Sequence, residues 1–429
     1  MKIITVTDSP LLCSGLGRVH RHVIDSLLEE GHQLVPCGWF CYDNGVMQKI
    51  KSGTKPPEIM YESGGNSVQV LPVPKRNNMN EIRAMYDVIN MVRPDVVITM
   101  GDYWDFYYMQ AMKVKCDFSF KWLAYLTIES DEIDEKILPL FRYADMIAVP
   151  TLFGKSVIEP LCECPVKFVP YGVDDKFVRF SDSERAELRE ERDCTDKIRF
   201  ITVAQNTMRK NLPALMQAVK LISHRDPQKK LQFYVHTNVD GVDPQERSIY
   251  DLRKIAQRLG VEDWFVFPEE STSLFSSPDD DLLVKEYNAS DFFITPSTCE
   301  GYGLPIMEAM RCGLPVIANG TSVMPEHLGC PVGDHSFGAT NRGWLVPNRV
   351  DIVPPERFIR IIKFDALGQA IWEMSQWLSD PKKKETLRQM RQNCIEYAKE
   401  RPWQAMKRGL CDALREVAGP ISIPVEVVR

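Results

Sequence analysis

Two glutamates separated by seven residues, Glu300 and Glu308, enclose a glycine-rich stretch. The stretch follows the apolar run 292–296 and leads into 309–313, which predicts a strand, a turn and a helix with Pro305 in its first turn. A helix N-terminus behind such a turn suits a phosphate or diphosphate. Glu308 would accept hydrogen bonds from a ribose, and Glu300 would reach another part of the same ligand. The segment therefore predicts a nucleotide-sugar site, although a plain strand-to-helix turn is an alternative.

Two adjacent cations, Arg209 and Lys210, lie between the apolar run 198–203 and a helical pattern that begins at Leu212. At the carboxyl end of a strand they would neutralise the two negative charges of a departing diphosphate, which is the electrostatic need of any transfer from a nucleoside diphosphate. A solvated basic pair is the alternative.

A third candidate site is the loop Ser14-Gly-Leu-Gly-Arg18 after the first apolar run. Gly15 and Gly17 permit close approach of the backbone to a ligand, and Arg18 can pair with a phosphate. The loop does not fit the dinucleotide fingerprint, because position 20 is histidine. A tight turn between a strand and a helix explains the glycines equally well.

The segment 101–108 is dense in aromatic residues and follows another predicted strand. Aromatic faces stack on sugars and bases, so Asp102, Trp104 and Asp105 are candidate acceptor-binding residues. Core packing of a helix is the explanation that we favour for the aromatic residues themselves.

Length and composition indicate a globular enzyme. A chain of 429 residues favours two domains, and 44% hydrophobic with 26% charged residues is typical of this class. No apolar run reaches about 18 residues, and the N-terminus has a strand pattern rather than that of a signal peptide, so we expect a cytoplasmic location. The twelve cysteines are scattered, which indicates reduced thiols.

The formal net charge of −7 argues against a strongly basic nucleic-acid binder. Residues 381–429 nevertheless hold eleven Lys or Arg against six Asp or Glu. An anionic surface is therefore a candidate partner near this basic tail, while a solvated helix face is the simpler interpretation.

Short β-rich runs alternate with helical patterns along the whole chain, which indicates βαβ units and parallel sheets with binding loops at the carboxyl ends of the strands. A charged segment, 181–197, interrupts the alternation and is interpreted as a connector or a surface helix. We predict an α/β fold of two doubly wound Rossmann-like domains that face each other across a cleft. The predicted strands are 3–7, 33–37, 68–73, 95–100, 121–127, 146–150, 198–203, 231–236, 265–267, 292–296, 316–318 and 344–346, together with 166–174, a strand that runs into a turn.

In their order along the chain, these pieces resemble the family-4 retaining glycosyltransferases, which have the GT-B architecture. The matching segments are 15–18, 150–155, 170–174, 209–211 and 300–317. Trp403 is similar to a residue of the family's final helix, which crosses back onto the first domain. The resemblance thus implies an acceptor-side domain over 1–175, a donor-side domain over 176–400 and a returning tail helix over 401–429.

The resemblance also implies a reaction. A sugar would pass from a nucleoside-diphosphate sugar to an acceptor hydroxyl with retention, by same-face attack and without a metal or other cofactor; the nucleotide-sugar is a co-substrate. Arg209 and Lys210 would hold the diphosphate, and the remaining contacts would surround the sugar and nucleoside. The implied donor site is Gly15, Gly17, Arg18, Asn206, Arg209, Lys210, Glu300, Gly301, Tyr302, Gly303, Leu304 and Glu308.

One departure from the family concerns a histidine that many relatives place after a strand of the first domain. The equivalent region here, 124–131, contains none. We predict that Glu129 or Asp131 replaces it as a sugar contact or acceptor-side base. The candidate catalytic residues are therefore Glu300, Arg209, Lys210, Glu129 and Asp131.

Two other functions fit the same features. A nucleotide-sugar epimerase shares the two-domain fold, and a non-catalytic nucleotide-sugar-binding protein would retain the same donor residues. The acceptor class stays open among saccharide, lipid, protein and nucleic acid, because this architecture serves them all.

Overall fold

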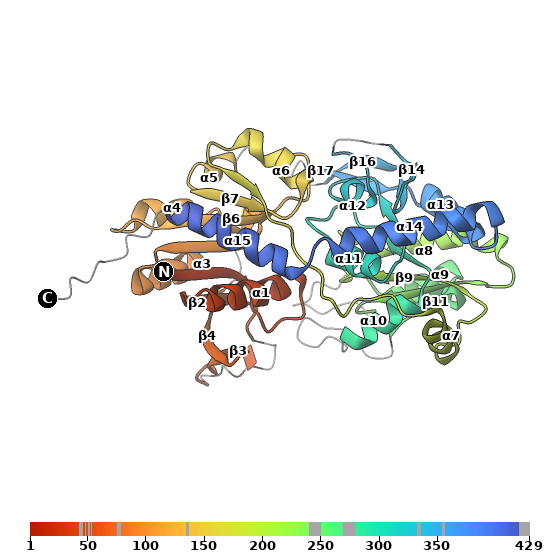
Figure 1. Cartoon of the computed structure of the whole chain (residues 1–429), viewed down its shortest axis with the longest axis horizontal. Helices are drawn as coiled ribbons and strands as arrows, with labels where there is room; N and C mark the ends of the chain where they lie inside the picture. Colours follow the sequence, from red (N-terminus) through yellow and green to blue (C-terminus); the bar gives the residue numbers. More distant parts are fainter. Residues whose placement is uncertain are drawn as a thin grey trace. The chain divides into compact units, whose positions relative to one another are not determined.

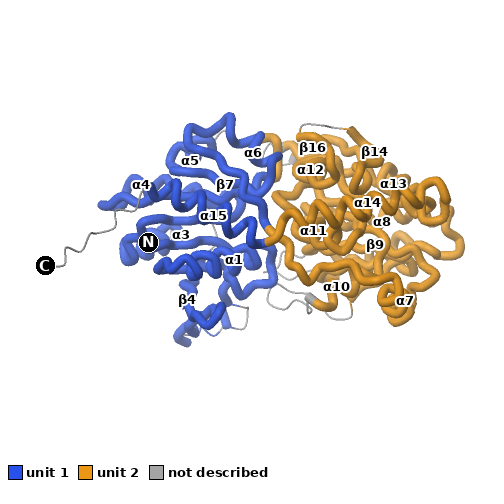
Figure 2. Tube along the Cα trace, viewed as in Figure 1, with its two compact units in different colours: residues 1–128, 133–171, 403–429 blue, residues 129–132, 172–402 orange. Residues whose placement is uncertain are grey.

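The computed structural model describes residues 1–42, 46–47, 49, 52, 54–74, 79–133, 137–239, 250–268, 280–332, 336–353 and 357–419. The chain forms two compact units. Unit 1 consists of Met1–Ile128, Ile133–Tyr171 and Trp403–Arg429, and unit 2 consists of Glu129–Glu132 and Gly172–Pro402. Figure 2 colours the two units separately.

Unit 1 is built on an eight-stranded sheet in the order β3-β4-β2-β1-β5-β6-β7-β8 (Figure 1). Its neighbouring strands are parallel except for the antiparallel pair β3–β4. The strands are β1 Lys2–Asp8, β2 Gln33–Trp39, β3 Ile59–Ser63, β4 Asn66–Pro72, β5 Val96–Asp102, β6 Lys121–Thr127, β7 Met146–Val149 and β8 Val166–Phe168.

Helices on both faces bury the central strands of this sheet, which explains why β1, β5, β6 and β7 are nearly continuous apolar runs rather than alternating ones. The helices are α1 Gly15–Glu29, α3 Met79–Val92, α4 Met109–Lys115, α5 Leu138–Phe141, α6 Leu152–Ile158 and α15 Trp403–Ala418, with short 3-10 turns at Tyr103–Phe106 and Glu159–Leu161.

Helix α15 belongs to unit 1 although it follows the whole of unit 2 in sequence. It packs on α1, where the His22 and Trp403 rings stack with centroids 3.9 Å apart and the Lys407 ammonium lies 2.8 Å from Glu29. The predicted return of the tail helix to the first domain is therefore confirmed. Residues 420–429, the last part of the predicted tail helix 401–429, lie outside the described residues.

Unit 2 has a seven-stranded sheet in the order β11-β10-β9-β12-β13-β15-β14, parallel except for β14–β15, and a separate two-stranded ribbon. The strands are β9 Ile198–Val203, β10 Leu231–His236, β11 Phe265–Val266, β12 Phe292–Thr295, β13 Val316–Asn319, β14 Gly338–Ala339, β15 Gly343–Val346, β16 Asn348–Val353 and β17 Arg357–Ile362. The helices are α7 Asp182–Glu191, α8 Leu212–Ile222, α9 Leu252–Leu259, α10 Asp280–Ala289, α11 Leu304–Arg311, α12 Met324–Leu328, α13 Phe364–Trp377 and α14 Pro381–Lys399, with 3-10 turns at Ser223–Arg225 and Glu262–Trp264.

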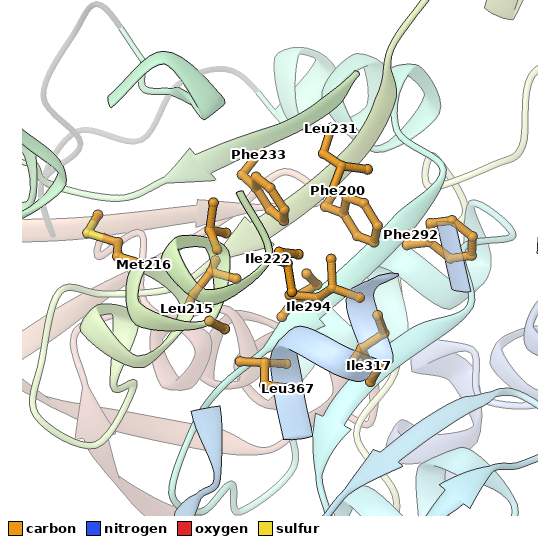
Figure 3. Packing of buried hydrophobic residues seen from close by; sticks show 14 of the residues in the cluster. Phe200, Leu215, Met216, Ile222, Leu231, Phe233, Phe292, Ile294, Ile317 and Leu367 are labelled. Atoms are coloured by element: carbon orange, nitrogen blue, oxygen red, sulfur yellow. The ribbon is translucent and has the colours of Figure 1, made fainter. Parts of the chain in front are cut away.

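Aromatic rings from neighbouring strands form the core of unit 2. Phe200 of β9 stacks between Phe233 and Phe292, with ring centroids 5.1 Å and 5.2 Å away. Figure 3 shows Ile222 of α8 beside these rings, and Leu215 of α8 and Leu367 of α13 belong to the same buried cluster. Burial of each side chain of this size contributes about 1.5–3 kcal/mol to the free energy of folding, so this layer stabilises the packing of the helices on the sheet.

The strand order of both sheets reverses at one point. Counted from the first strand, β4-β2-β1-β5-β6-β7 and β11-β10-β9-β12-β13-β15 both follow the doubly wound order 3-2-1-4-5-6. Ligands of such sheets bind outside the carboxyl ends of the strands at the reversal, which here means β1 with β5 and β9 with β12. The predicted fold class is confirmed for each unit.

Some elements differ from the prediction. The β16–β17 ribbon and β3 were not predicted. The charged segment after residue 180 begins with a capped helix, α7, which agrees with the surface helix among the two alternatives given for it. Strand β5 also runs two residues further, to Asp102. No helix within the described ranges is long and apolar enough to cross a lipid bilayer.

Candidate active site

Three of the predicted catalytic residues meet at the strand reversal of unit 2. Arg209 and Lys210 lie between β9 and α8, and Glu300 follows β12. The Lys210 ammonium is 2.5 Å from one carboxylate oxygen of Glu300, and the Arg209 guanidinium is 3.1 Å from the other. Because β9 and β12 are neighbours, the sheet itself brings these distant residues together. We call Arg209, Lys210 and Glu300, together with Glu129 as described in the third paragraph of this subsection, the cation–glutamate cluster.

Glu300 is 5% exposed, so its charge depends on these partners. Burial alone raises the pKa of the carboxyl group, but Lys210 and Arg209 outweigh this effect and hold the pKa at about 2. Burial lowers the pKa of Lys210, an effect that Glu300 opposes and Arg209 reinforces. Glu300 is consequently ionised at neutral pH and accepts hydrogen bonds from both cations.

Glu129 joins the same cluster through Arg209. It lies in the short segment Glu129–Glu132 that belongs to unit 2, and its Oε1 is 3.0 Å from the Arg209 guanidinium. The thiol of Cys299 also donates to Oε2 of Glu129, at 3.6 Å. Arg209 is therefore shared by two carboxylates, Glu129 and Glu300. Sequence patterns give no signal for this pairing.

Asp131 does not enter the cluster. Its carboxylate pairs with the guanidinium of Arg360 on β17, at 2.8 Å. The two predicted substitutes for the family histidine thus occupy different surroundings, and only Glu129 lies beside the basic pair.

The predicted turn and helix follow Glu300. Gly303 has a left-handed backbone, with φ 82°, directly before α11, and Pro305 lies in the first turn of that helix as expected. The left-handed conformation explains the need for glycine at this position. The hydroxyl of Ser322 accepts a hydrogen bond from the N–H of Glu300 at 3.0 Å, which fixes the entry to the turn.

Glu308 is the fifth residue of α11 and is buried, with 4% exposure. The Tyr287 hydroxyl of α10 donates a hydrogen bond to its Oε2 at 3.0 Å. A bound ribose would share this carboxylate with Tyr287, a partner that sequence analysis did not identify.

Asn206 connects the loops that follow β9 and β10. Its side-chain amide donates to the carbonyl oxygens of Asn238, at 2.9 Å, and Tyr250, at 2.6 Å. Its Oδ1 is buried and accepts no hydrogen bond from any residue in the described part of the chain. A buried acceptor of this kind is costly unless a ligand or water satisfies it, which fits its predicted place in the donor site.

Gly15, Gly17 and Arg18 lie at the start of α1 in unit 1. The Ser14 hydroxyl caps this helix by accepting from the N–H of Gly17 at 3.0 Å, and it donates to Asp8 at 2.7 Å. The sequence predicted Ser14 only as the start of this loop, without a role, and it did not predict Asp8.

Close backbone contacts require glycine at position 17. A Cβ there would lie 2.7 Å from the carbonyl oxygen of Leu12 and 2.9 Å from that of Ser9. The tight turn between β1 and α1 is therefore sufficient to explain glycine at position 17.

The candidate acceptor residues lie at the end of β5. Asp102 accepts a hydrogen bond from the hydroxyl of Thr127 at 2.6 Å, Trp104 is half-buried and Asp105 is 5% exposed. Three of their aromatic neighbours, Tyr103, Phe106 and Tyr108, are buried in the core of unit 1, as the favoured interpretation expects, whereas Tyr107 is exposed.

Comparison with known proteins agrees with this arrangement. Residues 197–352, which contain the cation–glutamate cluster except for Glu129, match the family model described as glycosyl transferases group 1. A serotype-specific mannosyltransferase WbdA of Escherichia coli is 28% identical over 237 residues, which cover 54% of this chain and 27% of that protein. The chain therefore spans about a quarter of the length of this curated relative.

Solved structures show the same fold. A sucrose-phosphate synthase from Thermosynechococcus elongatus superposes with a TM-score of 0.70 at 17% identity, over 97% of this chain and 99% of that one. Anabaena Alr3699/HepE in complex with UDP-glucose superposes with a TM-score of 0.64 at 13% identity, over 97% and 100%. Residues 197–352 thus match the glycosyl transferases group 1, and the solved structures share the fold of this chain.

Proposed function

We propose that this chain is a retaining glycosyltransferase that moves a sugar from a nucleoside-diphosphate sugar to an acceptor hydroxyl without a bound metal. The observation that carries the proposal is the cation–glutamate cluster at the strand reversal of unit 2. Arg209, Lys210 and Glu300 converge there from two neighbouring strands, beside the N-terminus of α11.

The cluster supplies the electrostatic stabilisation that this transfer needs. When the bond between the sugar C1 and the diphosphate oxygen breaks, negative charge develops on the leaving oxygen. Arg209, Lys210 and the positive end of α11 would stabilise that charge, which is the work a metal ion does in other transferases. The acceptor oxygen would bond to C1 from the same face, and its proton would pass to the leaving phosphate oxygen.

Donor binding would change the partners of Arg209. Two cations and the two carboxylates of Glu129 and Glu300 balance in charge, so an arriving diphosphate must compete with a carboxylate for Arg209. We propose that the diphosphate displaces Glu129, which then becomes available to the donor sugar or the acceptor.

Mutation of Glu129 and of Asp131, the two candidate replacements for the family histidine, tests this role. We expect Glu129→Gln to lower the transfer rate about 10²-fold, the lower end of what a general base contributes. Asp131→Asn is the matched control, because Arg360 rather than the basic pair holds Asp131. Full transfer rates in both variants would show that neither carboxylate takes part.

Donor and acceptor classes follow from the comparisons only as proposals. The HepE structure contains UDP-glucose and the WbdA relative is a mannosyltransferase, so we propose a nucleotide-linked hexose as donor. We propose that Asp102, Trp104 and Asp105 of unit 1 bind the acceptor. A cytoplasmic location and an anionic partner for the basic tail stay predictions.

The deciding experiment measures binding and slow hydrolysis of a panel of nucleotide-sugars, including UDP-glucose and GDP-mannose. We expect saturable binding of one donor with release of its nucleoside diphosphate, and weaker binding by Glu308→Ala. Glu385→Ala on an exposed part of α14 is the matched control. Absence of binding to every donor would contradict the proposal, and sugar inversion without a new glycosidic bond would indicate an epimerase.

A further inference from the structure

A buried histidine lies beneath the glycine turn that precedes α11. His327, on the short helix α12, is 1% exposed and contacts the turn through its ring. Its Nε2 is 2.6 Å from the carbonyl oxygen of Tyr302, and its Nδ1 is 3.0 Å from the hydroxyl of Tyr397 on α14. The histidine therefore links the turn to the C-terminal end of a long helix.

The direction of both hydrogen bonds is fixed by chemistry. Burial lowers the pKa of His327 to about 3, so the ring is neutral and carries one N–H. A carbonyl oxygen can only accept, so the proton must be on Nε2 and Nδ1 must accept. Burial also raises the pKa of Tyr397 to about 12, so the phenol keeps its proton and donates it to Nδ1.

Two arginines hold the tyrosine in place. The guanidinium carbons of Arg342 and Arg401 lie 3.9 Å and 3.6 Å from the centroid of the Tyr397 ring. Arg342 also donates to the carbonyl oxygen of His327 at 2.6 Å, and Arg401 donates to that of Tyr397 at 2.8 Å. These contacts restrict the movement of the Tyr397 ring and of the backbone of His327 and Tyr397.

The fixed carbonyl sets the direction of a neighbouring N–H group. In a trans peptide the C=O and N–H point to opposite sides, so the N–H of Gly303 points away from His327. No residue in the described ranges accepts a hydrogen bond from the N–H of Gly303 or of Leu304. Such first-turn groups need a partner from outside the helix, and an anion suits them.

We propose that His327 and Tyr397 are positioning residues that orient the peptide between Tyr302 and Gly303 toward the diphosphate of a nucleotide-sugar. The inference rests on the proposed function, because it specifies how the donor turn is held. Neither residue touches the donor; each acts through the backbone.

Two variants of His327 separate positioning from bulk packing. The side-chain amide nitrogen of His327→Gln reaches the place of Nε2 and donates to Tyr302, whereas that of His327→Asn reaches only the place of Nδ1. Calorimetric titration of the full chain with UDP, GDP and ADP should show binding by His327→Gln within about twofold of the native chain. His327→Asn should bind about tenfold more weakly, the cost of one lost hydrogen bond to a buried carbonyl.

Tyr397→Phe offers a gentler test, because it removes one hydroxyl and leaves the ring between its arginines. We expect nucleoside diphosphate affinity to fall about three- to fivefold. In the native chain, ¹⁵N NMR of the imidazole should show the Nε2–H tautomer unchanged from pH 5 to pH 8. In Tyr397→Phe the Nδ1 resonance should shift because its hydrogen-bond donor is gone.

The outcomes are distinguishable. If the native chain binds no member of the panel, the proposed function fails and the positioning role with it. If the native chain binds but His327→Asn and Tyr397→Phe bind equally well, only the positioning role fails, and an Nδ1–H tautomer would overturn it independently. Should both His327 variants fail to fold, the Tyr397→Phe titration alone supports or contradicts the role.

Discussion

The two strand reversals of this molecule have the same topology and different chemistry. In unit 2, the loops after β9 and β12 bring two cations onto one glutamate, Glu300. In unit 1, the last residues of β1 and β5 are carboxylates that accept from hydroxyls: Asp8 from Ser14, and Asp102 from Thr127.

This difference shows that the fold decides where a ligand binds and the loop residues decide which one. A basic pair beside a helix N-terminus favours an anionic diphosphate. Carboxylates that already accept from hydroxyls favour a polyhydroxyl ligand such as a sugar acceptor. We therefore propose that the donor binds unit 2 and the acceptor binds unit 1, and each half of this proposal can be tested separately.

The largest effect should come from the basic pair. Lys210→Met keeps the length of the side chain but removes its charge, so the leaving diphosphate loses a stabilising contact. We expect the transfer rate constant to fall about 10²–10³-fold, as for other lost oxyanion contacts. Lys220→Met on the exposed end of α8 is the matched control and should leave steady-state kinetics unchanged. A fall of less than threefold for Lys210→Met would refute the electrostatic role.

The next effect concerns stability and its pH dependence. The pKa of Glu300 is about 2 in the folded chain against an ordinary value of 4.5, which corresponds to about 3 kcal/mol of stability. Because the folded pKa is the lower one, this stability is present above about pH 5 and is lost as the pH falls toward 2. Glu300→Gln should therefore be less stable at neutral pH and show a flatter acid profile in urea unfolding. The exposed Glu385→Gln serves as control, and identical profiles for all three chains would contradict the prediction.

The glycines at the two strand reversals should differ in how much stability the chain loses when each is replaced by alanine. Gly17→Ala puts a Cβ against two backbone oxygens that cannot move aside, and we expect a loss of about 2–3 kcal/mol. Gly303→Ala meets the flexible tip of Ile306 and a left-handed backbone, for which we expect about 1–2 kcal/mol. Thermal unfolding measures both, and the reverse order would contradict the geometry of the turn at Gly17.

The smallest effect should separate acceptor from donor. Asp102→Asn weakens acceptance from a sugar hydroxyl, so the KM for the acceptor should rise about tenfold, as expected for one charge-assisted hydrogen bond. Affinity for the donor should stay unchanged, which calorimetry with the identified nucleotide-sugar would check. Equal losses in donor and acceptor binding would remove the distinction between the two reversals. Asp117→Asn, at an exposed position, is the control.

Buried parallel strands were the most predictable part of the fold. Residues 121–127, 198–203 and 231–236 were predicted with the bounds that the structure has, because continuous apolar runs between turns have few other solutions. Helix α7 was also readable, since Ser181 and Glu184 form a capping box at its start.

The candidate site was predictable only where its residues lie next to a local pattern. Arg209, Lys210 and Glu300 lie in loops that follow the neighbouring strands β9 and β12, so the parallel topology brings them together. Glu129 was named as a candidate, but its contact with Arg209, like the contacts of His327, joins residues far apart in sequence. No local sequence pattern marks such a contact, and the burial of one side chain cannot be deduced from its neighbours in sequence.

The return of α15 to unit 1 has a consequence for synthesis on the ribosome. Its buried residues Trp403, Met406 and Leu410 complete a core whose other parts are translated some 230 residues earlier, before Tyr171. The nascent chain must therefore carry an unfinished first unit, with the apolar surface of α1 exposed, while the whole of unit 2 emerges. Chaperones that recognise exposed apolar segments would find their target in this interval, and a stop codon near residue 400 would make that exposure permanent.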